Sequence, residues 1–95
     1  MEEFLKVLEE LYSIQGNSET DEDDGREYFT GCDIVEKAAE LCVENLVTED
    51  GDCDWDNIRI LRNNGYRVWA GEKDSFGWLS GCVQKQGDRR ILTYW

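Results

Sequence analysis

GCVQKQGDRRILTYW, residues 81–95, has the clearest β pattern in the sequence. Val83 precedes the polar run QGDR, and Ile91, Thr93, Tyr94 and Trp95 follow it, which is typical of two antiparallel strands joined by a turn. If Gly87 and Asp88 form a two-residue turn, Val83 lies opposite Leu92. The end of the sequence is therefore interpreted as a β-hairpin.

This register divides the hairpin side chains between two faces. The expected core face carries Leu79, Val83, Leu92 and Tyr94. The other face carries Trp78, Ser80, Cys82, Ile91, Thr93 and Trp95. Because the second face is rich in aromatic side chains, we expect another part of the chain or a partner to cover it.

Before this hairpin, YRVWAG at residues 66–71 predicts a further strand. Together with GWLSGCVQK at 77–85 and RRILTYW at 89–95 it makes a three-stranded antiparallel meander. The meander is the only sheet that the sequence predicts.

Residues 54–64 allow two interpretations. A helix would have Asp54 as its cap, Trp55, Ile58 and Leu61 on a buried stripe, and its arginines in the last turns, which suits the helix dipole. A strand over 57–63 is the alternative, since isoleucines alternate there and Asn-Gly follows. The order of the charges favours the helix.

Two more helices are expected in the first half of the chain. Residues 2–15 place apolar side chains at helical spacing and end at Gly16. A second helix begins near Asp33, which with Glu36 forms a candidate capping pair. Between the helices, residues 16–27 are interpreted as an acidic loop that can be mobile, because they contain almost nothing to bury.

The predicted fold is therefore a single α+β domain over residues 1–95. It has about three helices in the N-terminal two-thirds, followed by a three-stranded antiparallel β-meander, or four strands if 57–63 is a strand.

Charge is strongly asymmetric along the chain. The net charge is −12; residues 1–56 carry 19 acids against three bases, net −16, whereas residues 57–95 carry three acids against seven bases, net +4. Such a surface repels nucleic acid and anionic lipid and attracts basic partners. We expect no direct nucleic-acid binding and no membrane binding.

The chemistry-bearing residues do not form a recognisable catalytic or metal site. Histidine is absent, and Cys32, Cys42, Cys53 and Cys82 include no C-x-x-C pair, so we expect four reduced thiols and no zinc site. Alternating acids from Asp50 resemble the start of a calcium loop, but the sixth and twelfth positions hold Trp and Leu where an EF-hand needs Gly and Glu. We expect no cofactor, no metal and no enzyme activity.

The location expected from the sequence is cytoplasmic, or the host cytoplasm if the protein is viral. The amphipathic acidic start does not have the basic and apolar regions of a signal peptide, and no apolar run is long enough for a membrane span.

The expected function is binding. In size and charge the chain resembles small phage-encoded inhibitors, including anti-CRISPR and anti-restriction proteins, several of which act as nucleic-acid mimics. The resemblance implies a stoichiometric inhibitor of a basic, nucleic-acid-binding protein. The alternative is a protein–protein adaptor or accessory domain that uses the aromatic sheet face. A third hypothesis, ranked below both, is single-stranded nucleic-acid binding by the basic, aromatic β half.

The candidate partner-binding residues fall into four groups. They are Glu36, Glu40 and Glu44 on one helix face; Asp21, Glu22, Asp23 and Asp24; Asp50, Asp52, Asp54 and Asp56; and Trp78 with Trp95 on the aromatic face.

Overall fold

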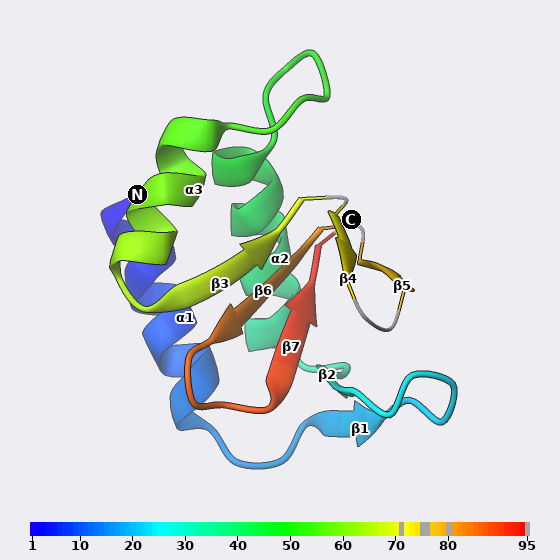
Figure 1. Cartoon of the computed structure of the whole chain (residues 1–95). Helices are drawn as coiled ribbons and strands as arrows, with labels where there is room; N and C mark the ends of the chain where they lie inside the picture. Colours follow the sequence, from blue (N-terminus) through cyan, green and yellow to red (C-terminus); the bar gives the residue numbers. More distant parts are fainter. Residues whose placement is uncertain (71, 75–76, 80, 95) are drawn as a thin grey trace.

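The computed structural model describes residues 1–70, 72–74, 77–79 and 81–94, and the side chains within 1–70 and 81–94. Within these residues it is α+β: three helices pack on one face of a mixed five-stranded sheet (Figure 1). None of the helices in the described part of the chain is long and apolar enough to cross a membrane.

The three helices form where the apolar periodicity indicates. They are α1 (Glu2–Ser13), α2 (Asp33–Leu46) and α3 (Trp55–Asn63). The strand alternative for 57–63 is therefore wrong, since Asp54 caps α3 by accepting a hydrogen bond from the Asn57 N–H at 3.2 Å. The capping pair predicted for α2 does not form: Cys32 is the cap residue, without a side-chain bond, and Asp33 is already helical.

The larger sheet has the strand order β1-β2-β7-β6-β3. Its strands are β1 (Ser18–Thr20), β2 (Glu27–Phe29), β3 (Tyr66–Trp69), β6 (Cys82–Lys85) and β7 (Arg90–Thr93). β3, β6 and β7 are the predicted antiparallel meander, and Val83 pairs with Leu92 as expected.

The tight turn of this hairpin differs from the predicted one. The Asp88 N–H donates to the Lys85 carbonyl at 3.1 Å, and Gly87 has a φ of 85°. The turn thus spans residues 85–88, whereas the prediction centred it on residues 87 and 88. The strand register is unchanged.

The meander is not the whole sheet, which corrects the predicted strand count, and two strands lie between α1 and α2, which corrects the predicted order of helices before strands. Residues 16–27 were expected to be a loop, but β1 and the start of β2 lie there. β2 pairs in parallel with β7, with Glu27 beside Arg90 and Tyr28 beside Ile91. β2 contributes Phe29 to the core, and that burial stabilises a strand too short to be recognised locally.

A second correction concerns residues 66–85. β4 (Glu72–Asp74) and β5 (Gly77–Leu79) form a separate two-stranded sheet, so the strand expected over 77–85 is divided into β5 and β6. The β4–β5 pairing continues the register of β3–β6, because the residue numbers of each pair have the same sum.

The core lies between the helices and the inner face of the sheet. Its largest fully buried side chains are Phe4, Leu8, Leu11, Leu46, Ile58, Leu61, Leu92, Val83 and Cys42. Val83 and Leu92 lie on the predicted core face, and Tyr94 packs against the same cluster. Leu79 falls in the part whose side chains are outside the described residues.

Candidate functional site

The outer face of α2 carries a row of carboxylates. Ala38, Cys42 and Leu46 are buried four residues apart, so the opposite side of the helix faces solvent. Glu36, Glu40 and Glu44 all lie there and are exposed. Successive Cα atoms in this α2 carboxylate row are separated by about 6 Å along the axis, from the rise of an α-helix.

The α2 carboxylate row is not neutralised locally. Among the described residues none of its three glutamates makes a salt bridge. Lys37 lies on the same outer surface, but its ammonium is 3.8 Å from the Glu3 carboxylate of α1, and both side chains are mostly exposed. Like charges four residues apart destabilise a helix by a few tenths of a kcal/mol per pair. The helix dipole favours Glu36, which lies in the first turn of α2, but no described contact offsets the cost at Glu40 and Glu44.

The loop between β1 and β2 is organised by its own acids. The Asp21 carboxylate accepts from the Asp23 N–H and the Asp24 carboxylate from the Arg26 N–H, both at 2.8 Å. The Tyr28 hydroxyl also donates to Asp24 at 2.6 Å, and this bond lowers the pKa of the carboxyl. Asp21 and Asp24 therefore shape the loop, while Glu22 and Asp23 are exposed at its tip.

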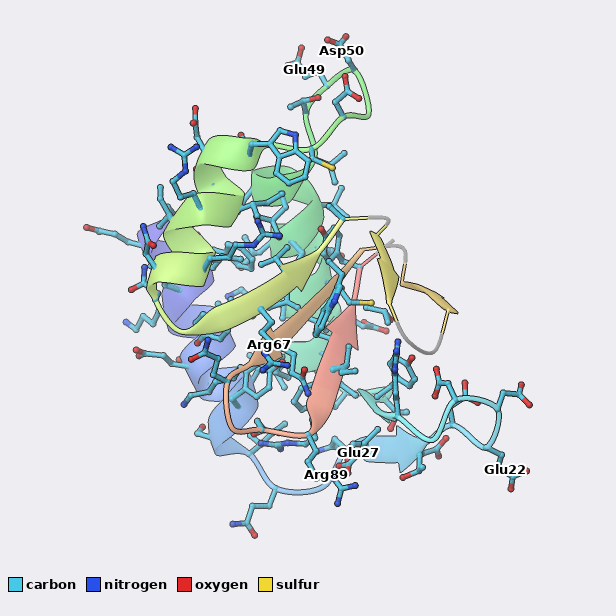
Figure 2. All side chains as sticks on the ribbon, in the orientation of Figure 1. Glu22, Glu27, Glu49, Asp50, Arg67 and Arg89 are labelled. Atoms are coloured by element: carbon cyan, nitrogen blue, oxygen red, sulfur yellow. The ribbon has the colours of Figure 1, made fainter. Side chains whose placement is uncertain are left out.

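The loop between α2 and α3 presents another group of acids. Its base is closed by an isolated bridge between Val47 and Cys53, and the Thr48 N–H donates to the Asp52 carbonyl at 2.8 Å. Figure 2 shows Glu49 and Asp50 pointing away from the body of the molecule. Asp52 is also exposed.

The last two acids of the Asp50–Asp56 series differ in their surroundings. Asp54 is half-buried and engaged as the cap of α3, as the sequence predicted. Asp56 is exposed in the first turn, where the helix dipole favours a negative charge. The series therefore combines one structural acid with three that face solvent.

The three acidic groups do not meet at one point. They lie on the β1–β2 loop, on α2 and on the α2–α3 loop, in the order of the sequence. Figure 2 shows Glu22 and the pair Glu49 and Asp50 at well-separated corners of the molecule. α2 begins a few residues after β2 and ends at the loop that carries Asp50, so it runs between the two loops. Its 14 residues span about 21 Å.

The aromatic sheet face is only partly visible. Trp95 and the side chain of Trp78 lie outside the described residues, so their predicted roles stay predictions. In the described part of this face Cys82 and Ile91 are buried, and Tyr28 and Trp69 pack against them. Tyr28 comes from β2, which the sequence analysis did not recognise as a strand.

Two surface features were missed from the sequence. Trp55 was placed on the buried stripe of α3, but its side chain is 53% exposed, because the buried side of the helix is centred between Ile58 and Leu61. A shallow, open depression lies beside β3 and is lined by Arg62, Tyr66, Arg67, Val68, Trp69 and Gln86. The sequence signal for the exposed Trp55 was its position in the first turn of α3. The signal for the depression was the spacing of the arginines.

The described residues offer little for covalent or metal chemistry. Cys32, Cys42 and Cys53 are free thiols, and burial raises the pKa of the Cys42 thiol, which keeps it protonated and poorly nucleophilic at neutral pH. No group of three Cys, Asp or Glu side chains in the described residues is arranged to hold a metal ion. Comparisons with protein-family models, curated proteins and solved structures found no match.

Proposed function

We propose that this chain is a small acidic binding protein that acts stoichiometrically on a basic, nucleic-acid-binding protein. The observation that carries the proposal is the α2 carboxylate row, three exposed glutamates on one helix face that no described cation neutralises. It would act as an inhibitor of the nucleic-acid-mimic type, such as a phage anti-CRISPR or anti-restriction protein.

The physical basis is substitution of carboxylates for phosphates. A groove that binds nucleic acid is lined by Lys and Arg, and its affinity arises largely from displacing counterions. A regular row of carboxylates on a rigid helix enters such a groove with the same long-range attraction. The α2–α3 loop, which follows α2 directly, adds exposed acids at the end of the helix.

The composition of α1 and α2 also supports a binding role for their negative charge. α1 and α2 together carry eight acids and two lysines, a net charge of −6. Repulsion within the α2 carboxylate row weakens the helix, and the carboxylates make no compensating described contact. A role in recognition supplies a reason for the arrangement that stability does not.

The first experiment is capture of partners from a lysate of the source organism, or of its host if the protein is viral. The immobilised chain is washed at low and at moderate salt, and retained proteins are identified by mass spectrometry. We expect a nucleic-acid-binding protein that is released by salt and by competing duplex DNA. A retained partner that resists salt and has no nucleic-acid role would contradict the proposal.

The second experiment uses the purified partner. Glu36→Gln, Glu40→Gln and Glu44→Gln are combined in one variant, which we expect to bind at least tenfold more weakly. The matched control changes three exposed glutamates of α1, Glu2, Glu9 and Glu10, to Gln, which alters the net charge equally. Equal losses in both variants would show that net charge matters and that the α2 carboxylate row has no special role.

A further inference from the structure

β3 is an edge strand of the larger sheet, and its hydrogen-bonding pattern shows which of its backbone groups point outward. The Gln86 N–H donates to the Gly65 carbonyl at 2.9 Å, so residues 65, 67 and 69 bond toward β6. In an antiparallel ladder the intervening residues then point away from the neighbouring strand. Tyr66 and Val68 therefore direct their N–H and C=O groups away from β6, although the two residues as a whole are only 5% and 4% exposed.

One of these outward groups already has a partner from α3. The Arg62 guanidinium donates to the Val68 carbonyl at 3.0 Å. This contact places one flank of α3 beside the β3 edge. Residues four and three positions apart share a helix flank, so Trp55, Arg59 and Arg62 lie together on that side.

The β3 edge is therefore bordered by positive charge on both faces of the sheet. Arg59 and Arg62 lie on the helix side, and Arg67 is exposed on the opposite face, as Figure 2 shows. Arg62 and Arg67 also line the shallow depression beside β3, together with half-buried Trp69. This surface is distinct from the acidic one and has the opposite sign.

We propose that the β3 edge binds an extended, acidic segment of a partner protein, which adds as a further strand. The outward groups of Tyr66 and Val68 supply main-chain hydrogen bonds, and Arg59, Arg62 and Arg67 pair with carboxylates on either face of the added strand. β3 has four residues, so the bound segment is short. This surface and its occupant do not depend on the proposed function of the α2 carboxylate row.

A short acidic peptide fits this surface better than a nucleic acid does. The outward backbone groups match another peptide backbone in spacing and direction. A nucleic-acid strand carries a charge about every 3.4 Å along its axis. It has no backbone N–H and C=O groups to pair with those of Tyr66 and Val68, so it cannot extend the ladder.

Arg62 blocks part of the β3 edge when no partner is bound. Its bond to Val68 occupies an edge acceptor and discourages pairing with a second edge strand. An incoming acidic strand exchanges this contact for one between the guanidinium and a carboxylate, which frees the Val68 carbonyl for the ladder. Acidic segments therefore open the edge, and neutral or basic segments leave it closed.

The test uses fluorescein-labelled hexapeptides with Glu at alternate positions and Val, Ile, Thr or Tyr between them. Matched sets carry Lys or Gln in place of Glu, and a further set has N-methylated backbone amides. Fluorescence anisotropy measures binding, and amide hydrogen exchange reports protection at Tyr66 and Val68. We expect binding of the Glu set, at least tenfold weaker binding of the other sets, and slower exchange at the Val68 amide.

Variants of the protein locate the site. Arg59→Glu with Arg67→Glu should reduce binding of the Glu set at least tenfold, whereas Lys6→Glu with Lys37→Glu makes the same charge change on the helices and should have little effect. If no Glu peptide binds, or if N-methylation has no effect, strand addition at this edge is wrong. If a thymidine oligonucleotide binds more tightly than the Glu peptides, the proposed acidic segment is wrong and the surface binds nucleic acid.

Discussion

At the scale of single residues, the Arg90 side chain makes hydrogen bonds and ring contacts with several elements of the fold. Its guanidinium donates to the backbone carbonyls of Tyr12 and Ile14 and to both oxygens of Asp88. It also lies over the rings of Tyr12 and Phe29, 5.7 and 4.9 Å from their centroids. Arg90 thereby joins the end of α1 to the centre of the sheet.

Replacing Arg90 with Ala should reduce the free energy of unfolding by about 2–4 kcal/mol, because two carbonyls and a carboxylate would lose a charged donor in a largely buried setting. Urea unfolding at 25 °C measures the change. Arg89→Ala is the matched control, since its side chain is exposed, and it should alter the stability by no more than about 0.5 kcal/mol. Similar values for the two variants would contradict the assignment.

The Asp88–Arg90 pair also predicts a pH dependence. The side-chain bond from Arg90 lowers the pKa of Asp88 from its ordinary value, so the carboxylate stabilises the fold above the pKa of the unfolded chain, about 3.9. That contribution is lost as the pH falls through the folded pKa. The stability difference between the wild type and Asp88→Asn should be constant above about pH 5 and shrink below about pH 4. Unfolding curves across this range measure it, and an unchanged difference would contradict the coupling.

Single acids can be separated into structural and exposed ones by the same approach. Asp54→Ala removes the cap of α3 and should reduce the stability by about 1 kcal/mol. Asp50→Ala removes an exposed carboxylate from the neighbouring loop and should leave stability nearly unchanged. Thermal unfolding distinguishes the two variants. Equal stability of both would mean that the cap contributes nothing.

At the scale of elements, the α2 carboxylate row links stability and binding in opposite directions. Converting Glu40 and Glu44 to Gln removes two repulsive pairs four residues apart, keeps Glu36 in the first turn where the helix dipole favours it, and should raise the stability by a few tenths of a kcal/mol. The same change should weaken the proposed complex. Chemical denaturation and a binding titration of one preparation test both effects, and a loss of stability would show that the row makes structural contacts.

Elements with a strong local pattern could be predicted from the sequence. The order of Asp54, Asp56 and the arginines identified α3, and the residues around QGDR gave the Val83–Leu92 register. β1 and β2 could not be recognised in the same way, because each has three residues and β2 pairs with a strand more than 60 positions away. Tyr28 and Phe29 were the available signal, but the neighbouring acids outweighed it.

The candidate site was predictable only in part for a related reason. Helical spacing was sufficient to place Glu36, Glu40 and Glu44 on one exposed face of α2. The role of Asp24 depends on Tyr28, and the outward groups of β3 depend on pairing with β6, so neither follows from local sequence. The exposure of Trp55 could not be predicted without knowing which side of α3 packs against the core.

At the scale of the whole molecule, charge is separated in space as well as in sequence. The helices and the two loops carry most of the acids, and the β3 edge carries arginines. Self-repulsion at a net charge of −12 opposes the compact state and is screened by salt. Raising sodium chloride from about 20 to about 500 mM should therefore increase the melting temperature while weakening the proposed complex. A melting temperature that falls with salt would indicate that favourable ion pairs dominate.

The position of β7 has a consequence for how the chain is made. The middle strand of the larger sheet consists of residues 90–93, which leave the ribosome after every other described element. Until they emerge, β2 has no parallel neighbour and β6 has an open side. The nascent chain can therefore form helices and the β3–β6 hairpin, but it completes its core only when translation has passed β7. Chains cut short before residue 90 should be recognised as unfolded and degraded, so quality control in the cell would act on full-length and truncated copies very differently.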